Sequence, residues 1–285
     1  MDGNQTIQWF PGHMAKTRRI ISESLKLVDA VAEIRDARIP LSSRNPELTG
    51  LIQNKKRLVL LNKCDVADET ATREWIEAFK KEGVPALPVD CRSGRGLQAF
   101  IPTMKDMLSE RLEQLKAKGM GGKSLRVMVV GIPNVGKSSF INRMAKGTRA
   151  KVEDRPGVTR GNQWFSVGGG LELLDTPGVL WPKFEDPVVG RNLAFTGAVK
   201  DTVMDVEELA FSLLGFLREH YPQAVTARYG VPLPEDADLY DIYEEIGRKR
   251  GFLASGGSVN TERVAVTLLD EFRAGKLGRI TLERP

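Results

Sequence analysis

The sequence predicts an α/β fold with a mainly parallel sheet and helices on both faces, followed by a small all-helical region. Through the first two thirds of the chain, short apolar runs alternate with amphipathic stretches, which is typical of a parallel sheet wound with helices. Beyond about residue 186, apolar side chains recur only at helical spacing. We therefore expect two domains, over residues 1–185 and 186–285.

Before the middle of the chain the pattern predicts three strands, each next to a helix. Short apolar runs predict the strands, and apolar residues that repeat with the helical period predict the helices. The strands are expected at residues 28–34, 58–61 and 86–89, and the helices at 14–27, 69–82 and 97–117. Gly83 and Pro85 end the helix that begins at residue 69.

A glycine-rich stretch at residues 119–122 is the clearest linker, and the strand pattern resumes after it. Strands are expected at residues 125–130, 163–167 and 171–174, and a helix at 137–145. In the helical region, Asp205 and Glu208 stand where a capping box would begin a helix. Further helices are expected near residues 238–249 and 261–272.

The composition is that of an ordinary globular protein, with 41% apolar and 28% charged residues among 285. No stretch approaches the roughly 20 apolar residues of a membrane span, and the N-terminal segment lacks a signal-peptide core. We expect a cytoplasmic protein without a membrane partner. A net charge of +5 is compatible with a polyanionic partner. Cys64 and Cys91 are expected to be small buried residues beside a ligand.

The strongest motif is GIPNVGKS at residues 131–138, of the form GxxxxGK[ST], between a predicted strand and a predicted helix. Such a loop points several backbone N–H groups at a phosphate, and the helix N-terminus adds its positive dipole end. Lys137 would reach the β- and γ-phosphates, and the Ser138 hydroxyl would bind magnesium. Val135, Gly136 and Ser139 are expected to contact the nucleotide as well.

The NKCD segment at residues 62–65 indicates which base is bound, because it follows a predicted strand at the edge where ligands bind. The Asp65 carboxylate can accept from both N1–H and the N2 amino group of guanine. Adenine offers no donor at these positions, so it would leave the carboxylate unpaired. Asn62 would brace the loop, Lys63 would lie over the base, and Cys64 completes the predicted set. The expected ligands are GTP and GDP.

A second guanine loop is expected at residues 90–94, after the next strand. It resembles the SAK-type loop, in which a backbone N–H meets guanine O6. Asp90 and Cys91 replace the usual serine and alanine, and Cys91 keeps the small side chain that a close approach requires.

Magnesium needs a further carboxylate, from a DxxG motif, and this pattern occurs at residues 154–157 and 175–178. The second directly follows a predicted strand, so we assign Asp175 to a water-mediated magnesium contact and the Gly178 N–H to the γ-phosphate. Thr159 is the candidate switch threonine for magnesium and the γ-phosphate. The alternative is that Thr159 is a loop residue without a ligand.

The order of these motifs is unusual. Ordinary GTPases run from P-loop through the switches to the guanine loops, whereas here the guanine loops come first. The same sheet is kept if the usual termini are joined and the chain is cut after the second switch. The predicted helix 97–117 and the linker at 119–122 supply that join. The sequence therefore predicts a circularly permuted P-loop GTPase, whose second switch runs toward the helical region.

With this order, the sequence closely resembles the ribosome biogenesis GTPase A (YlqF) family over its whole length. The resemblance rests on QWFPGHMAK (8–16), DARIP (36–40), NKCD (62–65), GIPNVGKSS (131–139), PGVT (156–159) and DTPG (175–178). It implies a factor acting late in the maturation of the large ribosomal subunit, bound to its RNA, with hydrolysis stimulated by that particle. An RNA-binding C-terminal domain and a free protein that is monomeric are expected with it.

Three residues bear on the mechanism. Val179 stands where a Ras-like enzyme has a water-orienting glutamine, so intrinsic hydrolysis should be slow. The resemblance implies that His13 is the substitute, brought to the attacking water by its N-terminal segment; without the resemblance, His13 would be a structural loop residue. Asn134 matches the asparagine that binds potassium in related GTPases, and its alternative role is to brace the loop.

A different class of function stays open. The chain could be a GTP-dependent RNA- or protein-binding scaffold with little intrinsic hydrolysis, and Val179 is the feature that favours this. A P-loop metabolic kinase is disfavoured by the NKCD segment and by the lack of an acceptor-site signature.

Overall fold

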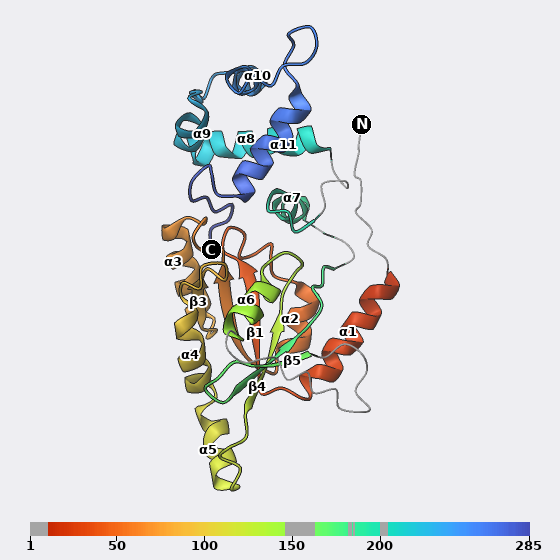
Figure 1. Cartoon of the computed structure of the whole chain (residues 1–285), viewed down its shortest axis with the longest axis vertical. Coiled ribbons are helices and arrows are strands. Elements are labelled where there is room, and N and C mark those ends of the chain that lie inside the picture. The colour runs from red at the N-terminus through yellow and green to blue at the C-terminus, as the bar shows by residue number, and fades with distance from the viewer. Residues whose placement is uncertain (1–10, 146–162, 182–183, 185, 200–204) are drawn as a thin grey trace. The chain divides into compact units, whose positions relative to one another are not determined.

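The structure is a computed structural model that describes residues 11–145, 163–181, 184, 186–199 and 205–285, with side chains from residue 18 onward (Figure 1). The chain forms two compact units. Unit 1 consists of residues 1–185 together with 283–285, and unit 2 of residues 186–282. Residues 283–285, which we had placed in the helical region, thus belong with unit 1.

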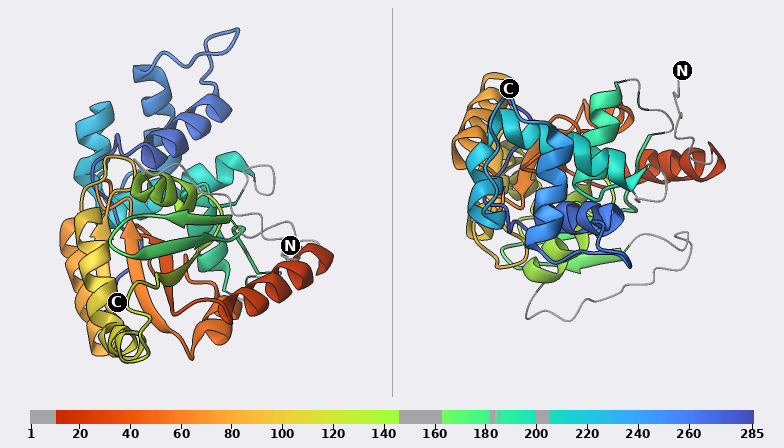
Figure 2. Two further views of the ribbon diagram at one scale, coloured as in Figure 1. Left: turned by 60° about the horizontal axis from the view of Figure 1, so that its bottom comes forward. Right: turned by 90° about the horizontal axis from the view of Figure 1, so that it is seen from above.

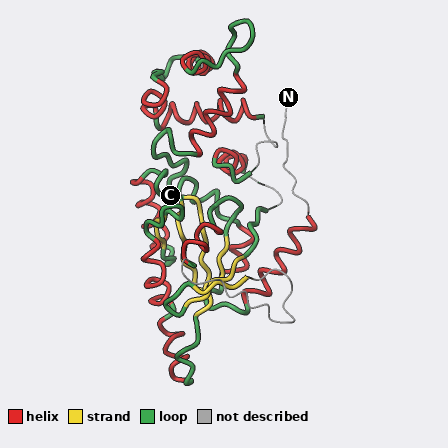
Figure 3. Tube along the Cα trace, in the orientation of Figure 1, coloured by secondary structure: helices red, strands yellow, loops and turns green. Residues whose placement is uncertain are grey.

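The described part of unit 1 contains one six-stranded sheet in the order β3-β2-β1-β4-β6-β5 (Figure 3, yellow). Its strands are β1 (Ala30–Asp36), β2 (Lys56–Asn62), β3 (Ala86–Val89), β4 (Leu125–Val130), β5 (Gln163–Ser166) and β6 (Leu171–Asp175). All neighbours are parallel except β5 and β6. The predicted α/β class with a mainly parallel sheet is confirmed.

The helices of unit 1 lie on both faces of this sheet (Figures 1 and 2). They are α1 (Pro11–Leu25), α2 (Pro46–Ile52), α3 (Glu69–Lys81), α4 (Phe100–Met107), α5 (Ser109–Ala117) and α6 (Lys137–Met144). The single helix predicted over 97–117 is instead a short 3-10 turn, α4 and α5, and it is interrupted at Leu108 (φ −105°, ψ 18°). Helix α2 was not predicted, because seven residues are too few to show a helical period.

Apolar side chains join these helices to the sheet. All seven residues of β1 are buried, as expected for a central parallel strand covered on both faces. Ile21 of α1 and Leu48 of α2 share one apolar cluster with Val31 of β1. Phe100 of α4 and Phe140 of α6 also meet edge to face, with ring centres 5.0 Å apart. The strands that carry the predicted motifs are therefore held in a rigid core.

Residues 283–285 pack on unit 1. The Glu283 carboxylate accepts hydrogen bonds from the backbone N–H groups of Leu41 (2.7 Å) and Ser42 (3.0 Å). The backbone carbonyl oxygen of Glu283 accepts from Trp75 Nε1 (3.1 Å). Arg284 forms ion pairs with Glu74 of α3 and with Asp68, its N-cap. Unit 2 is thus joined to unit 1 at both of its ends.

Unit 2 is helical in its described part. Its helices are α7 (Pro187–Phe195), α8 (Val206–His220), α9 (Pro222–Tyr229), α10 (Leu239–Lys249) and α11 (Thr261–Arg273). Asp205 caps α8, accepting from the N–H groups of Glu207 (2.9 Å) and Glu208 (3.0 Å), as the sequence predicted. Helices α7 and α9 were not predicted, and both begin at a proline in the position that favours helix starts. None of the described helices in either unit is long and apolar enough to cross a bilayer.

Candidate nucleotide-binding site

Three predicted ligand loops and the second DxxG motif meet at one edge of the sheet. They follow β2, β3, β4 and β6. Strand β2 is parallel to β3, strand β4 is parallel to β6, and β1 lies between β2 and β4 and is parallel to both. The carboxyl ends of parallel strands face the same way, so loops that are far apart in the sequence come together. The permuted order of the motifs therefore leaves the site intact.

The P-loop connects β4 to α6 and contains two glycines in the positive-φ region, Gly131 (φ 156°) and Gly136 (φ 106°). A Cβ at Gly131 would lie 2.6 Å from the Ile34 carbonyl oxygen, and one at Gly136 would lie 2.2 Å from Asn62 Nδ2. Glycine is required at both positions by backbone conformation and by space. Asn134 also has a positive φ of 58°, which asparagine tolerates better than most residues.

The side chain of Lys137, the first residue of α6, folds back over the P-loop. Its Nζ donates to the carbonyl oxygens of Gly131 (3.1 Å) and Ile132 (2.9 Å). Burial lowers the pKa of Lys137 to about 8, and the nearby Asp175 carboxylate partly opposes this. A phosphate at this position would raise the pKa of Lys137 again and so favour its charged form.

A cavity of about 400 Å³ lies between the P-loop and the second DxxG motif. Its lining includes Asn134, Lys137, Ser138, Asp175 and Gly178. A Cβ on Gly178 would lie 2.8 Å from Lys137 Nζ, so the two loops approach as closely as a glycine allows. This cavity brings together the predicted phosphate ligands and the two predicted magnesium ligands that the structure describes.

Of the two DxxG motifs, the structure describes only the second. Asp175 ends β6 and lines the cavity, and burial raises the pKa of its carboxyl. Residues 154–157 and Thr159 lie outside the described residues. Gln163, at the start of β5, lines the same cavity and was not predicted, because no motif contains it.

One side chain joins three loops. The amide of Asn62 donates through Nδ2 to the Val135 carbonyl oxygen of the P-loop (2.7 Å). It accepts through Oδ1 from the Cys91 N–H of the second guanine loop (2.9 Å). Asn62 is 4% exposed. The expected bracing role therefore extends beyond its own loop to the phosphate-binding side.

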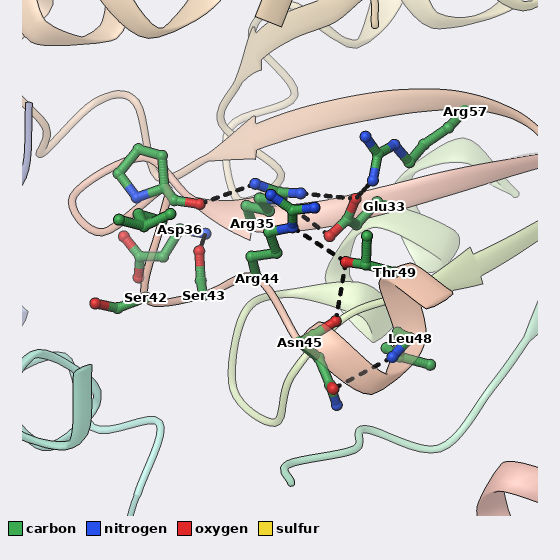
Figure 4. A network of polar contacts seen from close by, with 12 residues as sticks. Glu33, Arg35, Asp36, Ser42, Ser43, Arg44, Asn45, Leu48, Thr49 and Arg57 are labelled. Atoms are coloured by element: carbon green, nitrogen blue, oxygen red, sulfur yellow. Dashed lines mark hydrogen bonds and ion pairs between the residues drawn. The ribbon is translucent and has the colours of Figure 1, made fainter. Parts of the chain in front are cut away.

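Lys63 is held by a residue that the sequence analysis did not single out for function. Lys63 adopts a left-handed conformation (φ 63°), and its Nζ lies 2.9 Å from Asp36 Oδ2. Burial by itself would raise the pKa of the Asp36 carboxyl, but Arg38 and Lys63 hold it well below its usual range. The Asp36 backbone N–H also donates to the Ser43 hydroxyl oxygen (3.1 Å), as Figure 4 shows. Only the family motif at residues 36–40 pointed to this loop.

Asp65 and the second guanine loop face each other. The Asp65 carboxylate pairs with Arg92 Nη2 at 3.2 Å, and the Arg92 side chain is 81% exposed. An exposed pair contributes at most about 1 kcal/mol, so a base can displace it readily. Asp90 accepts from the Arg92 N–H (2.9 Å) and thus braces its own loop. The Cys91 N–H donates to Asn62 Oδ1. In this structure the Asp90 carboxylate and the Cys91 N–H are therefore both engaged within the protein and not free to bind a base.

Val179, the residue after the second DxxG motif, is buried in the apolar cluster that contains α1 and α2. Its N–H donates to the Gly131 carbonyl oxygen (3.4 Å), and its own carbonyl accepts from Asn45 Nδ2 (3.0 Å). Asn45 also caps α2 through Oδ1, toward Leu48 N–H, as Figure 4 shows. The cap could be predicted from the Asn-Pro-Glu sequence, but the bond to Val179 could not.

His13 lies in the first turn of α1, where we had expected a loop just before the helix. Its side chain is outside the described part of the structure. The proposed role of His13 in orienting water therefore stays a prediction.

Comparison with known proteins agrees with this geometry. Residues 126–224 match the family described as 50S ribosome-binding GTPase. The chain is 48% identical to the ribosome biogenesis GTPase A of Bacillus licheniformis, over 98% of each chain. It is 49% identical to that of Priestia megaterium, over 98% of this chain and 97% of the relative. The chain belongs to the ribosome biogenesis GTPase A family.

Within the ribosome biogenesis GTPase A family, a solved structure supports the fold as well. The GNP-bound YlqF of T. maritima is 31% identical and has a TM-score of 0.65, over 95% of this chain and 98% of that one. Family membership makes the protein a GTP-hydrolysing enzyme connected with ribosome biogenesis. GTPases of this kind generally use magnesium, and Ser138 and Asp175, which offer oxygen ligands on one cavity, fit that ion.

Proposed function

We propose that this protein is an assembly factor that acts late in the maturation of the large ribosomal subunit, and that the subunit stimulates its GTP hydrolysis. The observation that carries the proposal is the combination of an assembled nucleotide site with a buried Val179. An aliphatic side chain in a core cannot orient the attacking water. A different group must then orient the water, and a large partner can supply or order it. The names of the relatives and of the matching family support the ribosomal particle as that partner.

The roles of the residues at the phosphates follow from the site. The P-loop N–H groups and Lys137 would neutralise the charge of the β- and γ-phosphates, and the Gly178 N–H would contact the γ-phosphate. Ser138, Thr159 and, through water, Asp175 would hold magnesium, which supplies further charge neutralisation. Asn134 lines the cavity beside these residues, and we propose it as a ligand of potassium.

His13 would provide the group that Val179 cannot. We infer that its imidazole reaches the attacking water only when the ribosomal particle positions the N-terminal segment. Asp65 would select guanine, so both GTP and GDP bind. We further propose a cytoplasmic protein that is monomeric when free, without a membrane partner, and with RNA bound by unit 2.

The alternative function is a GTP-dependent scaffold with little hydrolysis of its own. The same burial of Val179 favours it, because the described site lacks a water-orienting side chain after the second DxxG motif. The two functions differ in whether binding the subunit changes the rate of hydrolysis.

GTP turnover, measured with and without purified large ribosomal subunits, tests the proposal. We expect slow turnover by the protein alone and a strong increase with subunits; stimulation of the size that activating partners reach, about 10⁵-fold, lowers the barrier by roughly 7 kcal/mol. The increase should be larger in potassium than in sodium buffer. If subunits bind in a GTP-dependent way without changing turnover, the scaffold is the better account. If subunits change nothing and ATP competes equally with GTP, the proposal fails.

A further inference from the structure

A second cavity lies in unit 1 at the amino ends of β1, β2 and β4, next to α5. The P-loop follows the carboxyl end of β4, so it belongs to the opposite end of the sheet from α5, which Figure 1 labels. Its volume is about 570 Å³, larger than the cavity beside the P-loop. Six cationic side chains and a single carboxylate line it. The cations are Lys26, Lys55, Lys56, Arg111, Lys123 and Arg126.

The carboxylate does not neutralise this lining. Asp29 accepts from Arg111 Nε (2.9 Å) through one oxygen and from the Arg126 backbone N–H (3.0 Å) through the other. It therefore orients Arg111 and ties the start of β1 to the start of β4. The Arg126 guanidinium pairs with Glu172 (3.2 Å) outside the lining. Even if both arginines are counted as compensated, four lysines remain.

Two of the lysines are held in place by backbone carbonyl oxygens. Lys55 Nζ donates to the Val28 carbonyl oxygen (2.7 Å), and Lys56 Nζ donates to the Met107 carbonyl oxygen (2.7 Å). A carbonyl dipole holds an ammonium in place but carries no net charge. Lys56 also lies 3.9 Å from a carboxylate of α5 that is 81% exposed, a pair that water largely screens.

The other two lysines, Lys26 and Lys123, are stronger evidence for a ligand. Lys26 and Lys123 are exposed, and among the described residues no hydrogen bond or ion pair engages either ammonium group. They approach the cavity from the end of α1 and from the linker before β4. Four ammonium groups lie around one cavity, and the one ion pair found among them in the described residues, that of Lys56, is exposed and weak; such a cavity attracts a ligand with several closely spaced negative charges.

We propose that this cavity binds the phosphodiester backbone of RNA; the inference rests on the proposed function, which makes ribosomal RNA the available polyanion. No aromatic side chain occurs among the described lining residues, so contacts to phosphates rather than stacked bases are expected. A membrane surface fits less well, because Leu27, 45% exposed, is the only exposed large apolar side chain of the described lining. Because the cavity is far from the P-loop end, RNA and GTP can bind together.

The test compares two variants with the same change in charge. Lys26→Glu/Lys123→Glu alters the cavity, and Lys80→Glu/Lys81→Glu alters two exposed lysines at the end of α3. Binding of the full-length protein to purified large-subunit ribosomal RNA is measured over a range of potassium chloride concentrations. The cavity variant should bind about tenfold more weakly or worse, and its salt slope should fall by about 1.4 to 1.8, since each phosphate contact contributes about 0.7 to 0.9. The α3 variant should stay within about twofold of the wild type, and both should bind GTP normally.

Equal losses in the two variants would overturn the inference, because general charge rather than the cavity would then govern binding. A wild type that binds phosphatidylglycerol vesicles but not RNA at the same salt would overturn it as well. If the charge reversal disturbs folding, Lys26→Gln/Lys123→Gln should still reduce the salt slope, and an unchanged slope there counts against the cavity. GTP turnover stimulated by subunits is measured separately. If the cavity variant binds RNA normally, the RNA site is wrong but the proposed function is unaffected. If subunits do not stimulate the wild type, the proposed function is wrong.

Discussion

Substituting Asn62 by alanine tests whether one amide holds the nucleotide site together. Asn62→Ala removes the hydrogen bond to the Val135 carbonyl and the one from the Cys91 N–H, both at a residue that is 4% exposed. Each such bond contributes about 0.5 to 1.5 kcal/mol, so the pair is worth about 1 to 3 kcal/mol. Both bonds lie in ligand loops outside the apolar clusters. Most of this free energy should therefore appear as weaker binding of GTP and GDP, by about 5- to 150-fold.

The assay is titration with a fluorescent GTP analogue and with its GDP counterpart, together with a thermal melt. Both nucleotides should lose affinity by the same factor, because the bonds brace loops and do not sense the γ-phosphate. Asp65→Asn is the matched control: it leaves both bonds in place and should instead shift the preference from GTP toward xanthosine triphosphate. Binding of Asn62→Ala within twofold of the wild type, with an unchanged melting temperature, would refute the reasoning.

Three further predictions concern other parts of the chain. His13→Ala should leave GTP affinity unchanged and should abolish most of the stimulation by large subunits, measured as turnover. Glu271→Gln should lower the free energy of unfolding of unit 2, measured in urea, more than the Glu244→Gln control does, because it leaves both Arg228 and Arg250 without the carboxylate that they share. Glu283→Ala should speed amide hydrogen exchange in the loop after β1, since its carboxylate accepts from two N–H groups there.

The Glu271 prediction also has a pH dependence. Hydrogen bonding to Arg228 lowers the pKa of Glu271 from 4.5 to about 2. A carboxyl whose pKa is depressed in the folded state stabilises that state above its unfolded pKa, and the contribution is lost as the pH falls from about 5 toward 2. Glu244→Gln, which removes an ion pair within one helix turn, is the control and should cost at most about 0.5 kcal/mol. Equal effects of the two substitutions would contradict the assigned importance of Glu271.

The other two predictions have their own contradicting results. An undiminished stimulated rate in His13→Ala, with GTP binding intact, would remove the catalytic role of that residue. For Glu283→Ala, exchange within β1 itself serves as the internal reference. Unchanged exchange at Leu41 and Ser42 would show that the carboxylate does not hold this loop.

The sequence alone predicted much of unit 1, because its signals are local. Strands β1 to β6 were visible as short apolar runs, and the P-loop glycines are demanded by backbone conformation at Gly131 and Gly136. The chemistry of the motifs is local in the same sense, because the few residues around Asp65 and Lys137 in the sequence are enough to predict what each side chain binds. The order of the motifs along the chain was enough to predict the permutation.

The helices that were missed, α2, α7 and α9, are short. Seven to nine residues give at most about two turns, so a helical period cannot be distinguished from chance. The proline at the start of each helix and the side-chain caps of α2 and α7 are local signals, but these signals show where a helix begins and not that one follows. The break of the predicted helix at Leu108 has no sequence signal that we can identify.

Only the tertiary structure decided how the loops support one another. Asp36 holds Lys63 across two neighbouring strands, Asn62 reaches residues 73 and 29 positions away, and Asn45 binds the Val179 carbonyl 134 positions away. A hydrogen bond between distant residues depends on the register of the sheet and on the placement of helices, which no short segment encodes. The cluster of lysines at the other end of the sheet arose in the same way. The sequence by itself thus determined which chemistry the chain carries, and the tertiary structure decided which residues hold that chemistry in place.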